Sequence, residues 1–142
     1  AESCTGGLIG HRLTQVSGSS KYFKEGFIVY SNEAKVSRLG VDQKILDEHG
    51  AVSEPIARSM AEGVCRAAGA DIGVSVTGIA GPTGGSEDKP VGLTFIAVSD
   101  AFGTWSGKYI YTHDRIKNKE RVAQTALNLV RMRLLGLLEE KK

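Results

Sequence analysis

The chain has 142 residues, which is within the usual range for one domain, and its 41% hydrophobic and 24% charged residues are ordinary for a globular protein. No apolar run approaches the roughly 18 residues that a membrane span needs. The formal net charge of +2, with basic residues scattered along the chain, is unlike the one-sided charge of nucleic-acid-binding proteins, so we predict one domain over residues 1–142 that binds neither membrane nor nucleic acid.

The predicted elements alternate between helix and strand. Short β-branched and aromatic runs predict the strands, and capping residues with apolar periodicity predict the helices. In chain order, they are a helix from Leu8, a strand over 27–30, helices over 32–40, 42–50 and 53–67, strands over 72–76, 93–98 and 108–111, and a helix over 118–138.

This order predicts an α/β fold, a three-layer α/β/α sandwich with a mixed, largely parallel sheet. The short 101–103 link indicates that the last two strands form an antiparallel hairpin. In open α/β sheets, ligands bind where strands end and helices begin, so the polar junctions are examined first for function.

The first polar junction is the run Glu-Ser-Cys-Thr-Gly-Gly at residues 2–7. One interpretation is a helix N-terminus capped by Ser3 or Thr5. The other makes Ser3 a nucleophile, because free N–H groups beside it could form an oxyanion hole.

The second junction places Lys35 near the start of the helix that Asn32 can cap. A solvated lysine there is unfavourable, because its charge opposes the positive end of the helix. With some burial, its pKa would fall far enough for the amine to take a proton from a serine. No histidine lies near a Ser–Asp pattern, so Ser–Lys is the favoured nucleophilic pair.

The third junction is the glycine-rich stretch 77–85, which follows a buried-looking strand. Its glycines would let backbone N–H groups approach a phosphate or carboxylate, although a flexible surface loop has the same composition. It lacks the spacing of a Walker A loop and of the dinucleotide fingerprint.

Cysteine and histidine usage bears on compartment and metal. Cys4 and Cys65 are too few for a disulfide scaffold and no signal peptide opens the chain, which predicts a reducing cytoplasm. His11, His49 and His113 are scattered and fit no zinc motif, so we expect no metal site.

Six blocks of sequence, in order, resemble the signature blocks of the CinA C-terminal (PncC) family. They are residues 2–7, 18–20, 30–35, 49–53, 77–82 and 89–92. The resemblance covers nearly the whole chain and implies a nicotinamide-nucleotide amidohydrolase, which converts nicotinamide mononucleotide and water to nicotinic acid mononucleotide and ammonia.

The resemblance also implies residue roles. Ser3 would be the nucleophile and Lys35 its general base, with Tyr30 supporting the pair, and no cofactor would be required. The candidate substrate-binding residues are Cys4, Thr5, Gly6, Gly7, Asn32, Thr77, Gly78, Gly81 and Arg115. The N–H groups near Cys4 and Thr5 would stabilise the oxyanion, while Arg115 and the glycine loop would bind the phosphate.

The family has a helix and a strand ahead of the first block, so we expect this chain to lack that first helix and strand. We expect it to correspond to a stand-alone form of the domain, for which a homodimer is one possible assembly. Two other functions stay open. One is a non-catalytic module that binds a nucleotide or a protein partner in competence or DNA damage. The other is a generic phosphate-binding α/β domain, in which ligand binding would not depend on Ser3.

Overall fold

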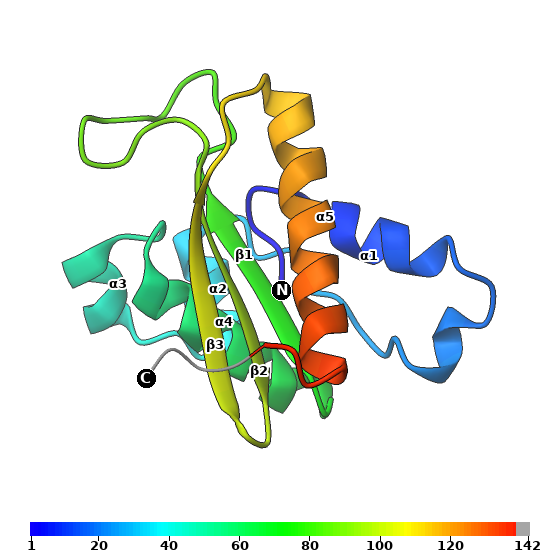
Figure 1. Cartoon of the computed structure of the whole chain (residues 1–142). Coiled ribbons are helices and arrows are strands. Elements are labelled where there is room, and N and C mark those ends of the chain that lie inside the picture. The colour runs from blue at the N-terminus through cyan, green and yellow to red at the C-terminus, as the bar shows by residue number, and fades with distance from the viewer. Residues whose placement is uncertain (139–142) are drawn as a thin grey trace.

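A computed structural model describes residues 1–138 of the chain. The elements are α1 (Leu8–Thr14), the 3₁₀ helix η1 (Ser19–Lys21), α2 (Asn32–Leu39), α3 (Gln43–His49), α4 (Glu54–Ala68), β1 (Gly73–Gly78), β2 (Leu93–Asp100), β3 (Gly103–Ile110) and α5 (Arg115–Leu134), as Figure 1 shows. None of the helices within these residues is long and apolar enough to cross a membrane.

The three strands form one antiparallel sheet in the order β1-β2-β3. Gly73 of β1 pairs with Ser99 of β2, and Leu93 of β2 pairs with Ile110 of β3. The predicted hairpin between the last two strands is confirmed, but the prediction of a largely parallel sheet is wrong for these strands. Residues 79–92 contain no helix to carry the chain back over the sheet, so β2 returns beside β1 in the opposite direction.

Parallel pairing is confined to the start of the chain. Glu2 forms single parallel bridges with Ile28 on one side and Val76 of β1 on the other. The Glu2 N–H donates to the Phe27 carbonyl at 2.8 Å, and the Val29 N–H donates to the Glu2 carbonyl at 2.9 Å. The strand predicted over 27–30 is therefore only an extended segment, because its partner offers a single bridging residue.

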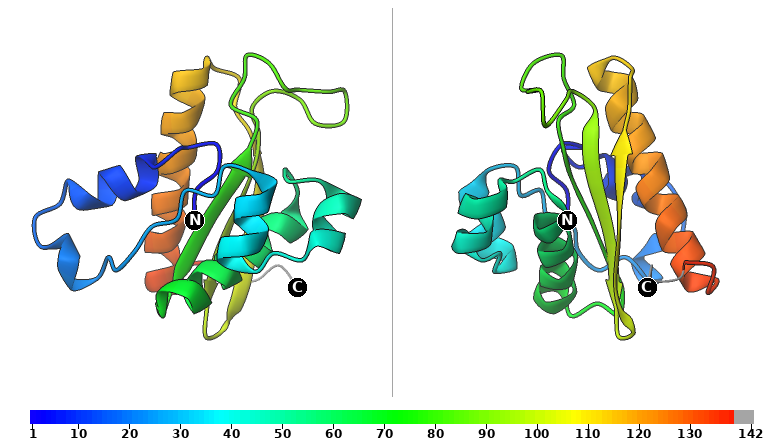
Figure 2. Two further views of the ribbon diagram at one scale, coloured as in Figure 1. Left: turned by 180° about the vertical axis from the view of Figure 1, so that it is seen from behind. Right: turned by 60° about the vertical axis from the view of Figure 1, so that its left-hand side comes forward.

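Helices cover both faces of the sheet, as the layered prediction required (Figure 2). On one face, the β1 and β2 side chains Val76, Ile96 and Val98 pack in one core with Val122 and Ala126 of α5. On the other face, Ala97 of β2 meets Ala57 and Ala61 of α4. A third cluster, which includes Leu39 of α2, Leu46 of α3 and Met60 of α4, attaches α2 and α3 to the outside of α4.

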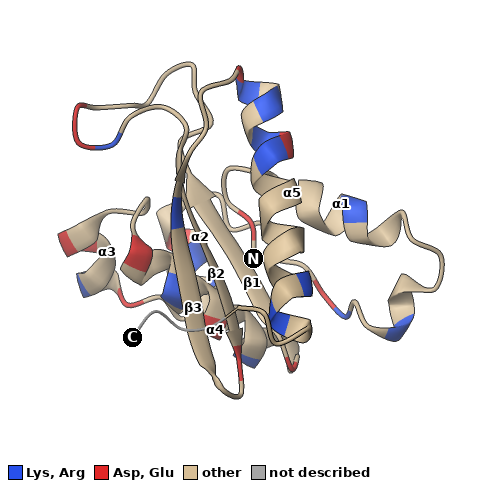
Figure 3. Ribbon diagram, in the orientation of Figure 1, with Lys and Arg blue, Asp and Glu red and all other residues tan. Residues whose placement is uncertain are grey.

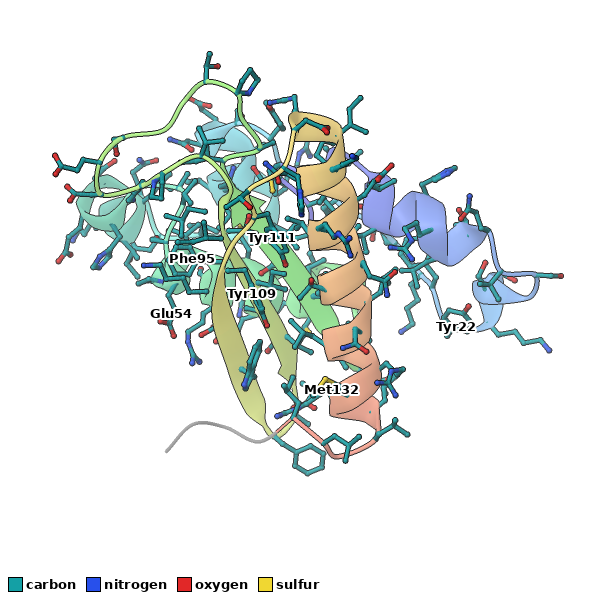
Figure 4. All side chains as sticks on the ribbon, turned by 45° about the horizontal axis from the view of Figure 1, so that its top comes forward. Tyr22, Glu54, Phe95, Tyr109, Tyr111 and Met132 are labelled. Atoms are coloured by element: carbon teal, nitrogen blue, oxygen red, sulfur yellow. The ribbon has the colours of Figure 1, made fainter. Side chains whose placement is uncertain are left out.

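The end of β3 is joined to α5 by aromatic side chains. The rings of Tyr109 and Tyr111 stack with their centroids 6.1 Å apart, and both residues are labelled in Figure 4. The Tyr111 hydroxyl donates to Thr125 Oγ1 of α5 at 2.7 Å. This contact holds the first half of α5 beside the end of the sheet where the polar junctions lie.

Most helix ends agree with the sequence to within a few residues. Asp42 caps α3 as predicted, but α2 is capped by Ser31 and not by Asn32. The last helix starts at Arg115, capped by Asp114, because the Asp114 carboxylate accepts from the Lys117 N–H at 3.0 Å. Neither Ser3 nor Thr5 caps α1, whose N-cap residue is Gly7.

Helices α2 and α4 approach each other closely at Gly63. A Cβ atom at Gly63 would overlap the carbonyl oxygen of Leu39 and lie 2.9 Å from the Leu39 Cβ. Glycine is therefore needed here for space, and α2 lies against α4 at backbone distance.

Candidate functional site

A cavity of about 200 Å³ lies where the start of the chain, the start of α2, the end of β1 and the first turn of α5 meet. Its lining includes eight of the candidate residues, namely Ser3, Cys4, Tyr30, Asn32, Lys35, Thr77, Gly78 and Arg115. Residues that are up to 112 positions apart in the chain are thus brought into one pocket. Thr5, Gly6, Gly7 and Gly81, which the sequence also suggested, do not line it.

Ser3 is held by the edge of the sheet. Its N–H donates to the Val76 carbonyl of β1 at 3.2 Å, and only 8% of the residue is exposed. The next residue, Cys4, is also buried, and burial raises the pKa of its thiol to about 11. The thiol therefore stays protonated near neutral pH and is a poor nucleophile. Ser3 remains the candidate nucleophile of this segment.

Lys35 is the most buried charged residue of the site, with 1% of its surface exposed. It shares the inner face of α2 with Leu39, one helical turn further on. Its Nζ lies 3.2 Å from Ser3 Oγ, so the two residues paired in the sequence analysis are in hydrogen-bond contact. Nζ also donates to the carbonyl of Val29 at 2.9 Å and to that of Tyr30 at 3.3 Å.

The burial of Lys35 shifts its protonation equilibrium toward the neutral amine. Burial lowers the pKa of Lys35 from its ordinary value, and none of the ion pairs within residues 1–138 includes it. A neutral amine has two N–H groups and one lone pair. The Val29 and Tyr30 carbonyls can take the two N–H groups, which leaves the lone pair free to accept the Ser3 hydroxyl proton.

Tyr30 and Arg115 form the exposed side of the cavity. Tyr30 is 62% exposed, and its hydroxyl accepts from Arg115 Nη2 at 3.4 Å, while its carbonyl contacts Lys35. Arg115 Nη1 donates to the Gly81 carbonyl at 2.7 Å. Arg115 belongs to a group of basic residues in the first turns of α5, visible in Figure 3. A cation therefore stands at the mouth of the pocket.

The glycine-rich loop contributes less to the cavity than its composition suggested. Thr77 and Gly78 line the pocket, and Thr77 Oγ1 donates to the Ala51 carbonyl at 2.8 Å. Gly78 has a packing reason to be glycine, because a Cβ there would lie 2.6 Å from Thr94 Oγ1 of β2. Gly81 acts through its carbonyl, which accepts from Arg115.

Thr5, Gly6 and Gly7 line a second, more open cavity of about 390 Å³. Lys119 and Ile116 of α5 lie across it. These three candidate residues therefore lie outside the Ser3 pocket, because the chain turns away from that pocket after Cys4. The backbone N–H groups of Cys4 and Thr5, however, donate to no backbone acceptor within the described residues.

Two buried polar residues beside the site were given no role in the sequence analysis. Asn118 is 1% exposed, and its Nδ2 donates to the Ala80 carbonyl at 3.0 Å while its Oδ1 accepts from the His113 N–H at 3.1 Å. A polar residue at helical spacing with Val122 and Ala126 on an apolar face was the available signal. The other is Glu2, which is 5% exposed.

Residues 1–138 hold no group of three or more His, Cys, Asp or Glu side chains that could bind a metal ion.

The fold of this chain matches solved structures of related proteins. The structure matches the competence/damage inducible protein CihA from Agrobacterium tumefaciens with a TM-score of 0.89 and 42% identity, over 91% of this chain and 79% of that one. It also matches the competence damage-inducible protein A (ComA) from Klebsiella pneumoniae with a TM-score of 0.91 and 31% identity, over 96% of this chain and 85% of that one.

Sequence relatives and the family model agree with the structural matches. A CinA-like protein from Chloroherpeton thalassium is 53% identical over 92% of this chain and 32% of its own length. The chain spans about a third of the length of the curated relatives that it matches. The model of the CinA C-terminal domain matches residues 1–134, and the chain belongs to this family.

Proposed function

We propose that this domain hydrolyses the carboxamide of nicotinamide mononucleotide to give nicotinic acid mononucleotide and ammonia. The observation that carries the proposal is the contact of 3.2 Å between Lys35 Nζ and Ser3 Oγ, buried and without a carboxylate partner for the lysine among the ion pairs of residues 1–138. A lysine in this state is suited to act as a base, and a serine beside it is suited to act as a nucleophile.

The reaction would proceed through an acyl-enzyme. Neutral Lys35 takes the proton of Ser3 as Oγ attacks the carboxamide carbon, and then gives that proton to the leaving ammonia. Water next attacks the ester with Lys35 as base, which releases the carboxylate product and restores Ser3. Each proton removed is returned and no atom changes its oxidation state, so the steps balance without a redox partner.

The substrate itself contributes to the reactivity. Its pyridinium ring carries a positive charge that makes the amide carbonyl more electrophilic, so the site mainly has to position the amide and stabilise the oxyanion. The N–H groups of Cys4 and Thr5 are the proposed oxyanion donors, since they directly follow Ser3 and have no backbone partner in the described part of the chain.

The nucleotide phosphate is proposed to bind at the mouth of the cavity. Arg115 lines the pocket with Thr77 and Gly78, and its guanidinium group can bind a phosphate with two parallel hydrogen bonds. The contacts of Arg115 with the Gly81 carbonyl and the Tyr30 hydroxyl hold this group in place before the substrate arrives.

The decisive experiment measures ammonia release from nicotinamide mononucleotide by the purified protein, by three variants of the pair and by one control variant. Ser3→Ala, Lys35→Ala and the double variant should be similarly inactive, because a nucleophile and its base act as one unit and their losses do not add. Ser17→Ala, which changes an exposed serine outside the site, should keep full activity. Binding of the mononucleotide without ammonia release would reject the amidohydrolase and favour a binding module.

A further inference from the structure

Glu2 is a buried acid that the proposed chemistry does not use. Its carboxylate accepts three hydrogen bonds, from Thr5 Oγ1 at 2.6 Å, from the Ile9 N–H at 2.9 Å and from the Gly10 N–H at 3.0 Å. A carboxylate is rarely buried unless its charge is compensated, and here the amides of the first turn of α1 compensate it. Glu2 therefore joins the start of the chain to α1.

The backbone explains why Glu2 and Ser3 face different partners. Residues 1–3 are extended between the 27–29 segment and β1, and successive side chains of an extended chain point to opposite faces. Glu2 consequently points toward α1, and Ser3 points toward Lys35 of α2. The buried anion is thereby separated from the buried amine, which would otherwise gain a counter-ion and stay protonated.

Glu2 also controls the turn that follows the nucleophile. The Ser3 carbonyl accepts from the Gly6 N–H at 3.1 Å, and the Thr5 carbonyl accepts from the Leu8 N–H at 3.2 Å. Thr5, in the middle of this turn, is 1% exposed and has its hydroxyl on the Glu2 carboxylate. The orientation of the Cys4 and Thr5 N–H groups thus depends on a contact that lies on the far side of the turn from the cavity.

We propose that Glu2 is a positioning residue whose carboxylate, through Thr5 and the first turn of α1, holds the 3–7 turn in the shape that directs the Cys4 and Thr5 N–H groups at the reacting carbonyl oxygen. Its effect on catalysis rests on the amidohydrolase function proposed above, but its effect on the turn does not. Glu2 contacts no substrate in this scheme, so it acts on the rate and not on substrate binding.

The test compares Glu2→Gln and Thr5→Val with Glu25→Gln, a control that makes the same chemical change at an exposed position. In Glu2→Gln the side-chain NH₂ faces the Gly10 N–H, so one of the three bonds is lost. Thr5→Val keeps the side-chain shape and removes only the hydroxyl. For both, we expect kcat for nicotinamide mononucleotide to fall by about 10- to 100-fold with KM within about twofold, as for a small misplacement of catalytic groups.

Amide hydrogen exchange gives the second readout, which is independent of turnover. Exchange of residues 3–8 should rise in Glu2→Gln and Thr5→Val, while that of β2 should stay as in the Glu25→Gln control. Unchanged exchange in the 3–8 segment, or a kcat within twofold of the original, would overturn the proposal. If the original protein releases no ammonia, the amidohydrolase function fails, and the exchange data alone decide whether Glu2 holds the turn. Thr5→Val serves as the test if Glu2→Gln does not fold.

Discussion

Replacing Lys35 by methionine removes the amine from the cavity but keeps a long, unbranched side chain in its place. Two opposing effects on stability follow. The buried Val29 carbonyl loses its donor, which costs about 1–3 kcal/mol. The ammonium group, however, no longer has to be buried, and burial of a charge costs several kcal/mol. We therefore expect Lys35→Met to be at least as stable as the original chain near neutral pH.

Activity should change in the opposite sense. A general base contributes about 10²- to 10⁴-fold to the rate, which corresponds to about 2.7–5.4 kcal/mol of barrier. Lys35→Met should therefore lose at least about 100-fold in kcat while gaining or keeping thermal stability. Lys35→Arg should be inactive too, because arginine cannot deprotonate near neutral pH. The matched control is Lys44→Met, which changes an exposed lysine on α3 and should affect neither quantity.

The pH dependence separates this account from a merely structural lysine. Burial lowers the pKa of Lys35, so between that lowered pKa and the ordinary value of 10.5 the unfolded chain binds more protons than the folded one. The free energy of unfolding must then rise with pH across this window, and Lys35→Met should lack this part of the rise. The kcat/KM of the original protein should also rise with pH through the same lowered pKa, as the amine of the free enzyme becomes neutral.

Denaturant unfolding over a pH series and ammonia release by the same preparations measure both effects. If Lys35→Met is much less stable than the original chain near neutral pH, the ammonium is acting as a structural tie and the argument from burial fails. Near-normal turnover by Lys35→Arg would remove the base from the mechanism.

The remaining predictions concern metal, phosphate and thiol. Activity should persist with EDTA present, because residues 1–138 hold no cluster of metal ligands, and loss of activity that zinc restores would contradict the mechanism. Nicotinamide riboside should be a much poorer substrate than the mononucleotide, and Arg115→Ala should reduce the difference in turnover between the two compounds. Equal turnover of both compounds by the original protein would contradict the proposed phosphate recognition. Because burial raises the pKa of Cys4 to about 11, iodoacetamide near neutral pH should leave Cys4 unmodified in peptide mapping and the activity intact, whereas alkylation of Cys4 with inactivation would show an accessible thiolate.

The pairing of Ser3 with Lys35 could be predicted because both residues stand at junctions of elements, where chain reversal brings side chains together. An unfavourable lysine in the first turn of a helix was a local signal that needed no knowledge of the fold. The resemblance to a family then connected two positions 32 residues apart, which periodicity alone could not do.

The direction of β2 and the role of Glu2 could not be predicted from local sequence patterns. Whether β2 runs parallel or antiparallel to β1 depends on the path of residues 79–92, whose glycines and prolines allow many paths. Glu2 acts on the amides of Ile9 and Gly10, which requires the chain to turn between them. The resemblance made Thr5, Gly6 and Gly7 candidate substrate-binding residues, but the turn after Cys4 places them in the other cavity and not beside Ser3.

The close approach of α2 and α4 at Gly63 gives the site a dependence on a residue that touches no part of it. Lys35 and Leu39 lie one turn apart on the same face of α2, and Leu39 rests directly on Gly63. A methyl group at Gly63 would lift the end of α2 away from α4 and would tilt the helix that carries the amine. The Lys35–Ser3 distance is thus set partly by how closely α2 packs on α4. A substitution as small as Gly63→Ala would then lower activity in the same way as loss of the base, although every residue of the candidate site is unchanged.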